Sequence, residues 1–154
     1  MKWRLDVLRG AISYLDSNVL IYAFEGPAED EQRRRLAGLF RDLEAGNARA
    51  CASVIARTEV LVRPLRSGDT ALTGWYQELL SGRGMLEVLA VNQTIADLAA
   101  ELRVELRTLR VPDALHLATA IHNGCANFVT GDKNLAAAAR RIRVLMLDDL
   151  SDKT

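Results

Sequence analysis

Short apolar runs, each about as long as one strand, alternate along this chain with longer segments of helical period. Strands that alternate with helices favour a parallel sheet covered on both faces. The pattern therefore predicts an α/β fold with a central, mainly parallel sheet. The expected strands are residues 12–15, 48–52, 86–91 and 127–130, with a weaker fifth candidate at 143–147. The expected helices are residues 30–44, 54–65, 69–80, 95–109 and 114–122.

The length and the charge of the chain limit its class. A chain of 154 residues can bury a real core, and we expect one domain over residues 1–154. Its core is expected at about 12–147, after a charged N-terminal extension at 1–11. Lys+Arg and Asp+Glu both number 20, so the net charge is zero and predicts no strong overall attraction to nucleic acid. A local basic rim is still compatible with this balance.

The composition also predicts a cytoplasmic protein that does not enter a membrane. The first ten residues carry charges throughout and lack the apolar stretch of a signal peptide. No uninterrupted apolar run is long enough to cross a bilayer. Cys51 and Cys125 form no CxxC pair, and we expect both to be reduced, buried, small apolar residues.

Two aspartates stand where expected strands end. Asp16 interrupts the apolar stretch Y-L-D-S-N-V-L-I-Y-A-F, and Asp132 follows the strand in F-V-T-G-D. Ligands of open parallel sheets bind beyond the carboxyl ends of the strands, so both positions suit a functional site. Each aspartate is about equally well explained as the N-cap of the helix that follows it.

Two further acids come from expected helices. Glu59 shares a helix face with Ile55 and Val62, and an ionised carboxylate on an inner face needs a cation or several donors. An ion pair with Arg63, four residues on, is the alternative. Asp113 follows Pro112 in the first turn of a helix, where the helix dipole alone favours an acid.

Other ionisable residues are assigned to structure. Asp97 lies in T-I-A-D, which matches a capping box with Asp in place of Glu, and serves as a control. His116 is expected to be a packed or hydrogen-bonding residue and not a ligand. Five further acids are expected to be solvated charges of loops or termini: Glu25, Asp30, Glu31, Asp148 and Asp149.

Several carboxylates in one place cannot all stay ionised without a counter-charge. A set of oxygen ligands without Cys or His suits Mg²⁺ or Mn²⁺. Such a site suits hydrolysis of a phosphodiester, because a metal ion can activate water and neutralise the scissile phosphate.

With these residues in place, the chain resembles the PIN-domain ribonucleases, in particular the VapC-type toxins of type II toxin–antitoxin pairs. Four segments carry the resemblance in order over residues 12 to about 147: Y-L-D-S-N-V-L-I-Y-A-F, S-V-I-A-R-T-E-V-L, D-A-L-H-L-A-T-A and F-V-T-G-D-K-N-L. The resemblance implies a three-layer α/β/α sandwich and an endoribonuclease that uses one or two Mg²⁺ or Mn²⁺ ions. It also implies a small antitoxin partner and a homodimer.

The resemblance also implies roles for particular residues. The acids that would hold the metal and carry catalysis are Asp16, Glu59, Asp113 and Asp132. Asn18 and Thr130 match polar residues that support the site. Since the net charge is zero, RNA affinity should come from the metal and local cations, although each cation alone is equally a solvated surface charge. The candidates are Arg57, Arg63, Arg110 and Lys133.

Three alternatives stay open. A phosphatase of the haloacid dehalogenase type also uses a strand-end aspartate, but the second aspartate that it needs two residues later is Asn18 here. A PIN-like binding module would keep the fold without turnover, and the intact set of four acids argues against it. A PIN nuclease of housekeeping RNA maturation would differ from a toxin in its neighbouring genes.

Overall fold

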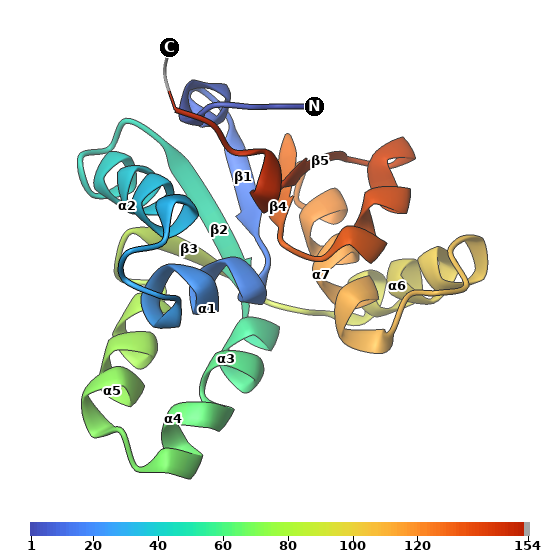
Figure 1. The fold of residues 1–154 in the computed structure, drawn as a ribbon. Helices are drawn as coiled ribbons and strands as arrows, with labels where there is room; N and C mark the ends of the chain where they lie inside the picture. The colour runs from blue at the N-terminus through green and yellow to red at the C-terminus, as the bar shows by residue number, and fades with distance from the viewer. Residues whose placement is uncertain (153–154) are drawn as a thin grey trace.

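A five-stranded, wholly parallel sheet forms the centre of the computed structural model, which describes residues 1–152 (Figure 1). The strand order is β3-β2-β1-β4-β5. Tyr14 of the central strand lies opposite Cys51 of β2 and Phe128 of β4. The predicted α/β class and its five strands are confirmed. Their bounds are β1 Ile12–Leu15, β2 Arg49–Ser53, β3 Leu86–Leu89, β4 Asn127–Thr130 and β5 Arg143–Met146.

Helices cover both faces of the sheet, which gives the predicted three layers (Figure 1). Successive strand residues point to opposite faces, so Leu15 packs with α1, α2, α3 and α5, and Tyr14 packs with α6 and α7. The helix bounds of the first face are α1 Ser17–Glu25, α2 Glu31–Glu44, α3 Val54–Val60 and α5 Thr70–Leu79. Those of the second face are α6 Gln93–Glu105 and α7 Val111–His122. The 3₁₀ segment η2, Lys133–Arg140, packs on the same face.

The helix predicted over residues 54–65 is two helices. It breaks at Leu61, and α4 then spans Val62–Ser67. Pro64 explains the break, because it lacks the N–H that would bond to the carbonyl of Val60 and its ring clashes with that carbonyl. Helix α4 ends at Gly68, whose φ of 73° is the left-handed conformation of a helix C-cap.

The capping box predicted at residues 94–97 is wrong. Helix α6 begins two residues before Ile95, at Gln93, and its N-cap is Asn92, whose side chain accepts a bond from the Ile95 N–H at 3.0 Å. Asp97 lies on the exposed side of the helix, as expected of a structural control. Asn92 outcompetes the Thr94 pattern because its amide oxygen reaches the free N–H groups of the first turn.

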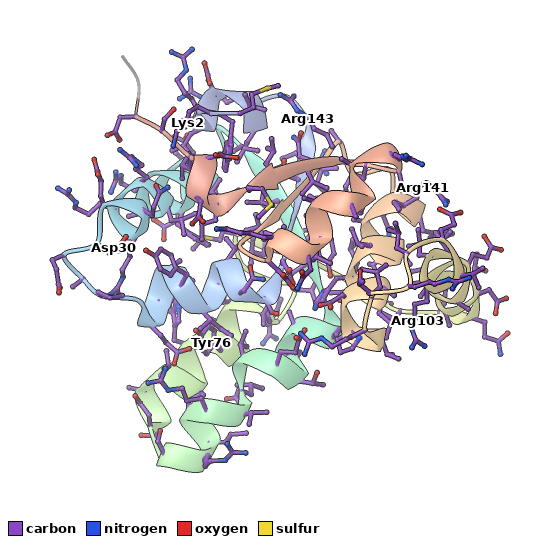
Figure 2. The ribbon with its side chains drawn as sticks, turned by 45° about the vertical axis from the view of Figure 1, so that its right-hand side comes forward. Lys2, Asp30, Tyr76, Arg103, Arg141 and Arg143 are labelled. Carbon is purple, nitrogen blue, oxygen red and sulfur yellow. The ribbon has the colours of Figure 1, made fainter. Side chains whose placement is uncertain are left out.

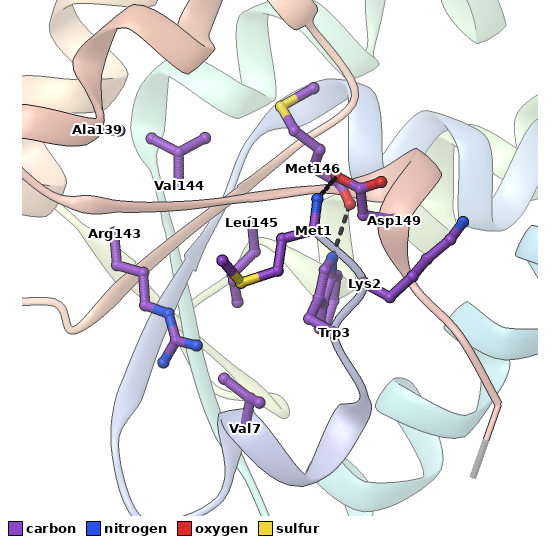
Figure 3. A pocket seen from close by; sticks show the side chains of 10 residues that line it. All are labelled: Met1, Lys2, Trp3, Val7, Ala139, Arg143, Val144, Leu145, Met146 and Asp149. Carbon is purple, nitrogen blue, oxygen red and sulfur yellow. Dashed lines mark hydrogen bonds and ion pairs between the residues drawn. The ribbon is translucent and has the colours of Figure 1, made fainter. Parts of the chain in front are cut away.

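The charged N-terminal extension is tied to the C-terminal end of the described chain. Trp3 pairs with Leu150 in an isolated parallel bridge, and its indole N–H donates to the carbonyl of Met146 at 2.7 Å (Figure 3). The 3₁₀ segments η1 (Leu5–Leu8) and η3 (Leu147–Asp149) flank this contact. A cavity of about 450 Å³ lies between the N-terminus and β5, and none of the four candidate acids lines it (Figure 3).

The two cysteines are buried free thiols, as predicted. Although 74 positions separate them in sequence, their Sγ atoms lie 3.4 Å apart on the α7 side of the sheet. The contact with Cys125, together with burial, raises the pKa of the Cys51 thiol. Within residues 1–152, no helix combines the length and the apolar character that crossing a membrane requires.

Candidate active site

Asp16 lies at the end of the central strand β1 and is 3% exposed. Its Oδ1 accepts the N–H of Ser17 at 2.8 Å, so Asp16 is the N-cap of α1. Its Oδ2 accepts the hydroxyl of Thr130 at 2.8 Å and the amide of Asn18 at 3.0 Å. The N-cap explanation is therefore correct, but it accounts for only one of the two oxygens.

Burial is the main cause that raises the pKa of Asp16 above its ordinary value. The nearby charge of Glu59 also raises this pKa, while His116, Thr130 and the Ser17 N–H lower it. The folded chain therefore holds a carboxylate that is costly to ionise beside a second carboxylate. A positive charge at this point would lower that cost.

Glu59 comes from α3 and contacts the imidazole Nε2 of His116. The same nitrogen lies 3.8 Å from Oδ1 of Asp16, so one buried histidine faces two of the candidate acids. The alternative pairing of Glu59 with Arg63 is wrong, because Arg63 instead pairs with Glu25 at 3.7 Å. The inner-face placement of Glu59 is supported, with its side chain one-third exposed.

A chain of buried polar side chains continues behind His116. Its Nδ1 lies 2.6 Å from the hydroxyl of Tyr14, and that hydroxyl lies 3.0 Å from Oγ of Ser53. The Tyr14 ring stacks on Phe128, with 5.3 Å between the ring centroids. Burial raises the pKa of Tyr14 well above its ordinary value, so the phenol keeps its proton.

Asp132 approaches the site from the loop after β4. Its N–H donates to Thr130 Oγ1 at 3.0 Å, and its carboxylate caps η2 by accepting the N–H of Asn134 at 2.9 Å. Asn18 connects the first turn of α1 to the loop after β4, because its Oδ1 accepts the N–H of Gly131 at 2.8 Å. Asn18 and Asp132 also line a hollow of about 450 Å³ that opens beside α1 and the loop after β4. Asn18 and Thr130 thus connect the environments of Asp16 and Asp132.

Asp113 lies in the first turn of α7, as predicted, with Arg110 at 3.5 Å. Among residues 1–152, no three His, Cys, Asp or Glu side chains are close enough together to hold a metal ion. Local contacts explain why the acids lie apart. Glu59 contacts His116, Asp113 pairs with Arg110, and Asp132 caps the start of η2. The sharing of one cation by all four acids therefore stays a prediction.

The four candidate cations for RNA binding all have contacts within the chain. Arg57 is half-buried and donates to the carbonyl of Leu80 at 2.9 Å, which gives it a structural role. Arg63 and Arg110 pair with acids, but their side chains are about four-fifths exposed. Lys133 is 83% exposed and lies 3.7 Å from Asp148. Exposed pairs of this kind are weak, so these three stay available to a phosphate.

Sequence reasoning missed two features of the charged network. Glu25 is not a solvated charge: its side chain is 9% exposed, and it accepts the hydroxyl of Tyr76 at 2.6 Å. Asp30 is the N-cap of α2 and not a loose loop charge (Figure 2). Two signals could have revealed these roles. Residues 17–25 form a helix that contains Glu25, and Asp30 stands just before a charged helix.

The polar chain of Tyr14, Ser53 and His116 was missed as well. The prediction that His116 is a hydrogen-bonding residue is borne out by its contacts, but its place between two acids was not foreseen. The spacing of Asp113 and His116, three residues apart on one helix, indicated only that His116 lies near a candidate acid, and no sequence signal pointed to Tyr14 or Ser53.

The donor set suits a hard divalent cation. Asp16 and Glu59 offer carboxylate oxygens that converge on one nitrogen of His116, and the charge of Glu59 opposes the ionisation of Asp16. Carboxylate oxygens are the ligands that Mg²⁺ and Mn²⁺ prefer. The residues present are therefore compatible with such an ion.

The family model of the PIN domain matches residues 13–141. Since this is most of the chain, the chain belongs to the PIN domain family, which is a family of nucleases. The resemblance identified from four sequence segments is thereby confirmed.

Solved structures share the same fold. A toxin–antitoxin complex from Klebsiella pneumoniae contains a chain with 25% identity and a TM-score of 0.65, over 88% of this chain and 97% of that one. VapBC2 from Rickettsia felis, bound to a DNA fragment from its promoter, matches with 18% identity and a TM-score of 0.66, over 92% and 99%. FitAcB from Neisseria gonorrhoeae matches with 20% identity and a TM-score of 0.66, over 88% and 97%. Among proteins with curated functions, none matches this chain in sequence.

Proposed function

We propose that this chain is a metal-dependent endoribonuclease that hydrolyses RNA phosphodiesters, and that it is the toxin of a type II toxin–antitoxin pair. One observation carries the proposal: in a PIN domain, the buried Asp16 at the end of the central strand faces Glu59 across His116. Two acids that are costly to keep charged together form a place for a divalent cation.

In this proposal Asp16 and Glu59 hold Mg²⁺ or Mn²⁺, and Asp113 and Asp132 complete the set once their carboxylates turn toward it. When bound, the metal ion supplies an activated water and compensates the charge of the scissile phosphate. Thr130 and Asn18 hold the Oδ2 of Asp16 through their hydrogen bonds, and Oδ1 lies 3.8 Å from the His116 nitrogen that contacts Glu59. This arrangement orients Asp16 without neutralising it.

The RNA is proposed to lie over the start of α1 and the loop that follows β4. The hollow beside Asn18 and Asp132 opens there, and Lys133 lies next to it in sequence. Arg63, Arg110 and Lys133 are the exposed cations that would contact phosphates, whereas Arg57 is assigned to packing. Their effect on affinity should weaken as salt rises, because exposed charges are screened.

The partners are part of the same proposal. The similar solved chains are described as parts of toxin–antitoxin complexes, which supports a small antitoxin partner for this chain. A homodimer and a cytoplasmic location are proposed with it. Purification of the chain after co-expression with its neighbouring small gene tests the partner, and a monomer alone on the column would contradict it.

The decisive experiment is cleavage of a pooled cellular RNA by the purified chain with Mg²⁺, with Mn²⁺ and with EDTA. The Asp16→Asn variant is assayed beside it, and Asp97→Asn is the matched control, since it makes the same change at an exposed acid far from the site in sequence. Cleavage that needs metal, disappears with Asp16→Asn and survives Asp97→Asn supports the proposal. Metal binding without cleavage of any RNA would indicate a binding module instead.

A further inference from the structure

His116 is fully buried in α7, and both of its ring nitrogens contact polar side chains. Nε2 contacts Glu59 and lies 3.8 Å from Asp16, while Nδ1 lies 2.6 Å from the Tyr14 hydroxyl. Each nitrogen therefore has one hydrogen-bond partner. The partner of Nε2 is Glu59, one of the two acids that define the candidate active site, and the other acid, Asp16, lies within ion-pair distance of the same nitrogen.

The chemistry of these partners determines where the histidine carries a proton. An ionised carboxylate only accepts hydrogen bonds, so the nitrogen that contacts Glu59 must be the donor. On the other side, Tyr14 is itself held by Ser53 and by stacking on Phe128. The imidazole plane is therefore fixed at one edge by a rigid phenol, and its Nε2–H is directed at Glu59.

Glu59 needs such a contact because its side chain is long and one-third exposed. Left alone, it would populate rotamers directed into water, since ordering a glutamate costs side-chain entropy. The only other partner suggested by sequence, Arg63, pairs with Glu25 instead. The contact with His116 is what keeps the Glu59 carboxylate on the side of Asp16.

We propose that His116 is a positioning residue: its Nε2–H holds the Glu59 carboxylate beside Asp16, and Tyr14 holds the imidazole ring, so that the two acids are arranged in advance for one divalent cation. The inference rests on the proposed function. It gives Tyr14 and Ser53 a role as well, because they orient the group that orients a metal ligand.

The test measures the binding of Mn²⁺ to the full chain. Electron paramagnetic resonance reports how much of the ion remains free. His116→Leu removes both ring nitrogens, and His116→Gln retains an amide donor that reaches about as far as Nε2. Thr119→Val is the matched control, because Thr119 is also fully buried in α7 and its hydroxyl bonds only the Leu115 carbonyl. Thermal unfolding without metal shows that each variant is folded.

We expect His116→Leu to weaken Mn²⁺ binding about 10- to 100-fold, the usual effect of removing a group that orients a metal ligand. His116→Gln should recover most of that loss, and Thr119→Val should bind as the wild type does. Equal affinity of His116→Leu and the wild type would overturn the inference. So would an equal loss in the Leu and Gln variants, because that result would mean that His116 acts through packing alone.

The outcome for the proposed function is separate. A wild-type chain that binds Mn²⁺ but cuts no RNA overturns the nuclease and leaves the Mn²⁺ comparison valid. A wild-type chain that binds no Mn²⁺ overturns both. If His116→Leu does not fold, ¹⁵N resonances of the wild-type imidazole decide: a protonated Nε2 supports the inference, and an unprotonated Nε2 contradicts it.

Discussion

At the scale of single residues, Asp16 combines two roles that are often separate. One oxygen caps a helix, which is a stabilising contact, and the whole carboxylate is buried beside another acid, which is a destabilising one. A chain that only needed an N-cap could use Ser or Asn here without the charge. The cost of the charge is therefore better explained by a site than by the helix.

This balance predicts that Asp16→Asn stabilises the metal-free protein at neutral pH while it abolishes cleavage. Because burial raises the pKa of Asp16 above 3.8, the folded state binds its proton more tightly than the unfolded state does. Ionisation of Asp16 then lowers the free energy of unfolding as the pH rises above that value. Asparagine removes this loss, and Tm should rise by about 2–4 °C for each kcal/mol recovered.

The pH dependence of this gain in Tm is the control. As the pH falls toward 3.8, Asp16 takes up its proton and the charge difference between the variant and the wild type vanishes. The gain in Tm should therefore shrink between pH 7 and about pH 4, as followed by circular dichroism. A gain independent of pH would mean that packing, and not charge, separates the two proteins.

At the scale of elements, the helix starts show how local chemistry decides between neighbouring signals. Asn92 caps α6, and Asp97 lies on the exposed side one turn later. Asn92→Ala should lower the free energy of unfolding by about 1 kcal/mol, because an N–H of the first turn loses its acceptor.

Asp97→Asn should change that free energy by less than about 0.5 kcal/mol, as is usual for exposed positions. Urea unfolding of both variants measures the difference, and both should keep the cleavage activity. A larger loss for Asp97→Asn than for Asn92→Ala would restore the capping box at residues 94–97.

At the scale of the whole molecule, the N-terminal extension and the C-terminal end stabilise each other through Trp3. The indole is 5% exposed and bonds the Met146 carbonyl, whereas Trp75 is 39% exposed and makes an edge contact with Phe24. Trp3→Ala should cost about 3–5 kcal/mol. Trp75→Ala should cost about 1 kcal/mol.

Chemical unfolding of the two tryptophan variants compares a buried and a half-exposed site of the same chemistry. Both variants should cut RNA at a temperature where they remain folded, since neither residue lies among the candidate site residues. Equal costs for the two would show that the N-terminal extension contributes little to the stability of the domain.

The two thiols test the burial of the core on the α7 side. Cys51 and Cys125 contact each other and are both buried, so a thiol reagent should label neither in the native protein and both after unfolding. Mass spectrometry counts the labels. Rapid labelling of the native chain would contradict the packing of β2 against the turn before β4.

The sequence alone determined the class of the fold and the identity of the candidate acids. Strand and helix periods are local, and strand-end aspartates mark the edge of a parallel sheet where a site can form. β1 and β4 were therefore predicted to the residue. The break at Leu61 and the cap at Asn92 were missed because neighbouring signals compete within a few residues.

Only the tertiary structure decided how those acids are held. Whether Glu59 pairs with Arg63 or with His116 depends on the packing of α3 against α7, which no spacing within one helix encodes. The burial of Glu25 and the contact of Cys51 with Cys125 depend on packing in the same way. The reason is physical: residue type and period set what an element buries, but the partner of a buried polar group comes from whichever distant segment packs against it.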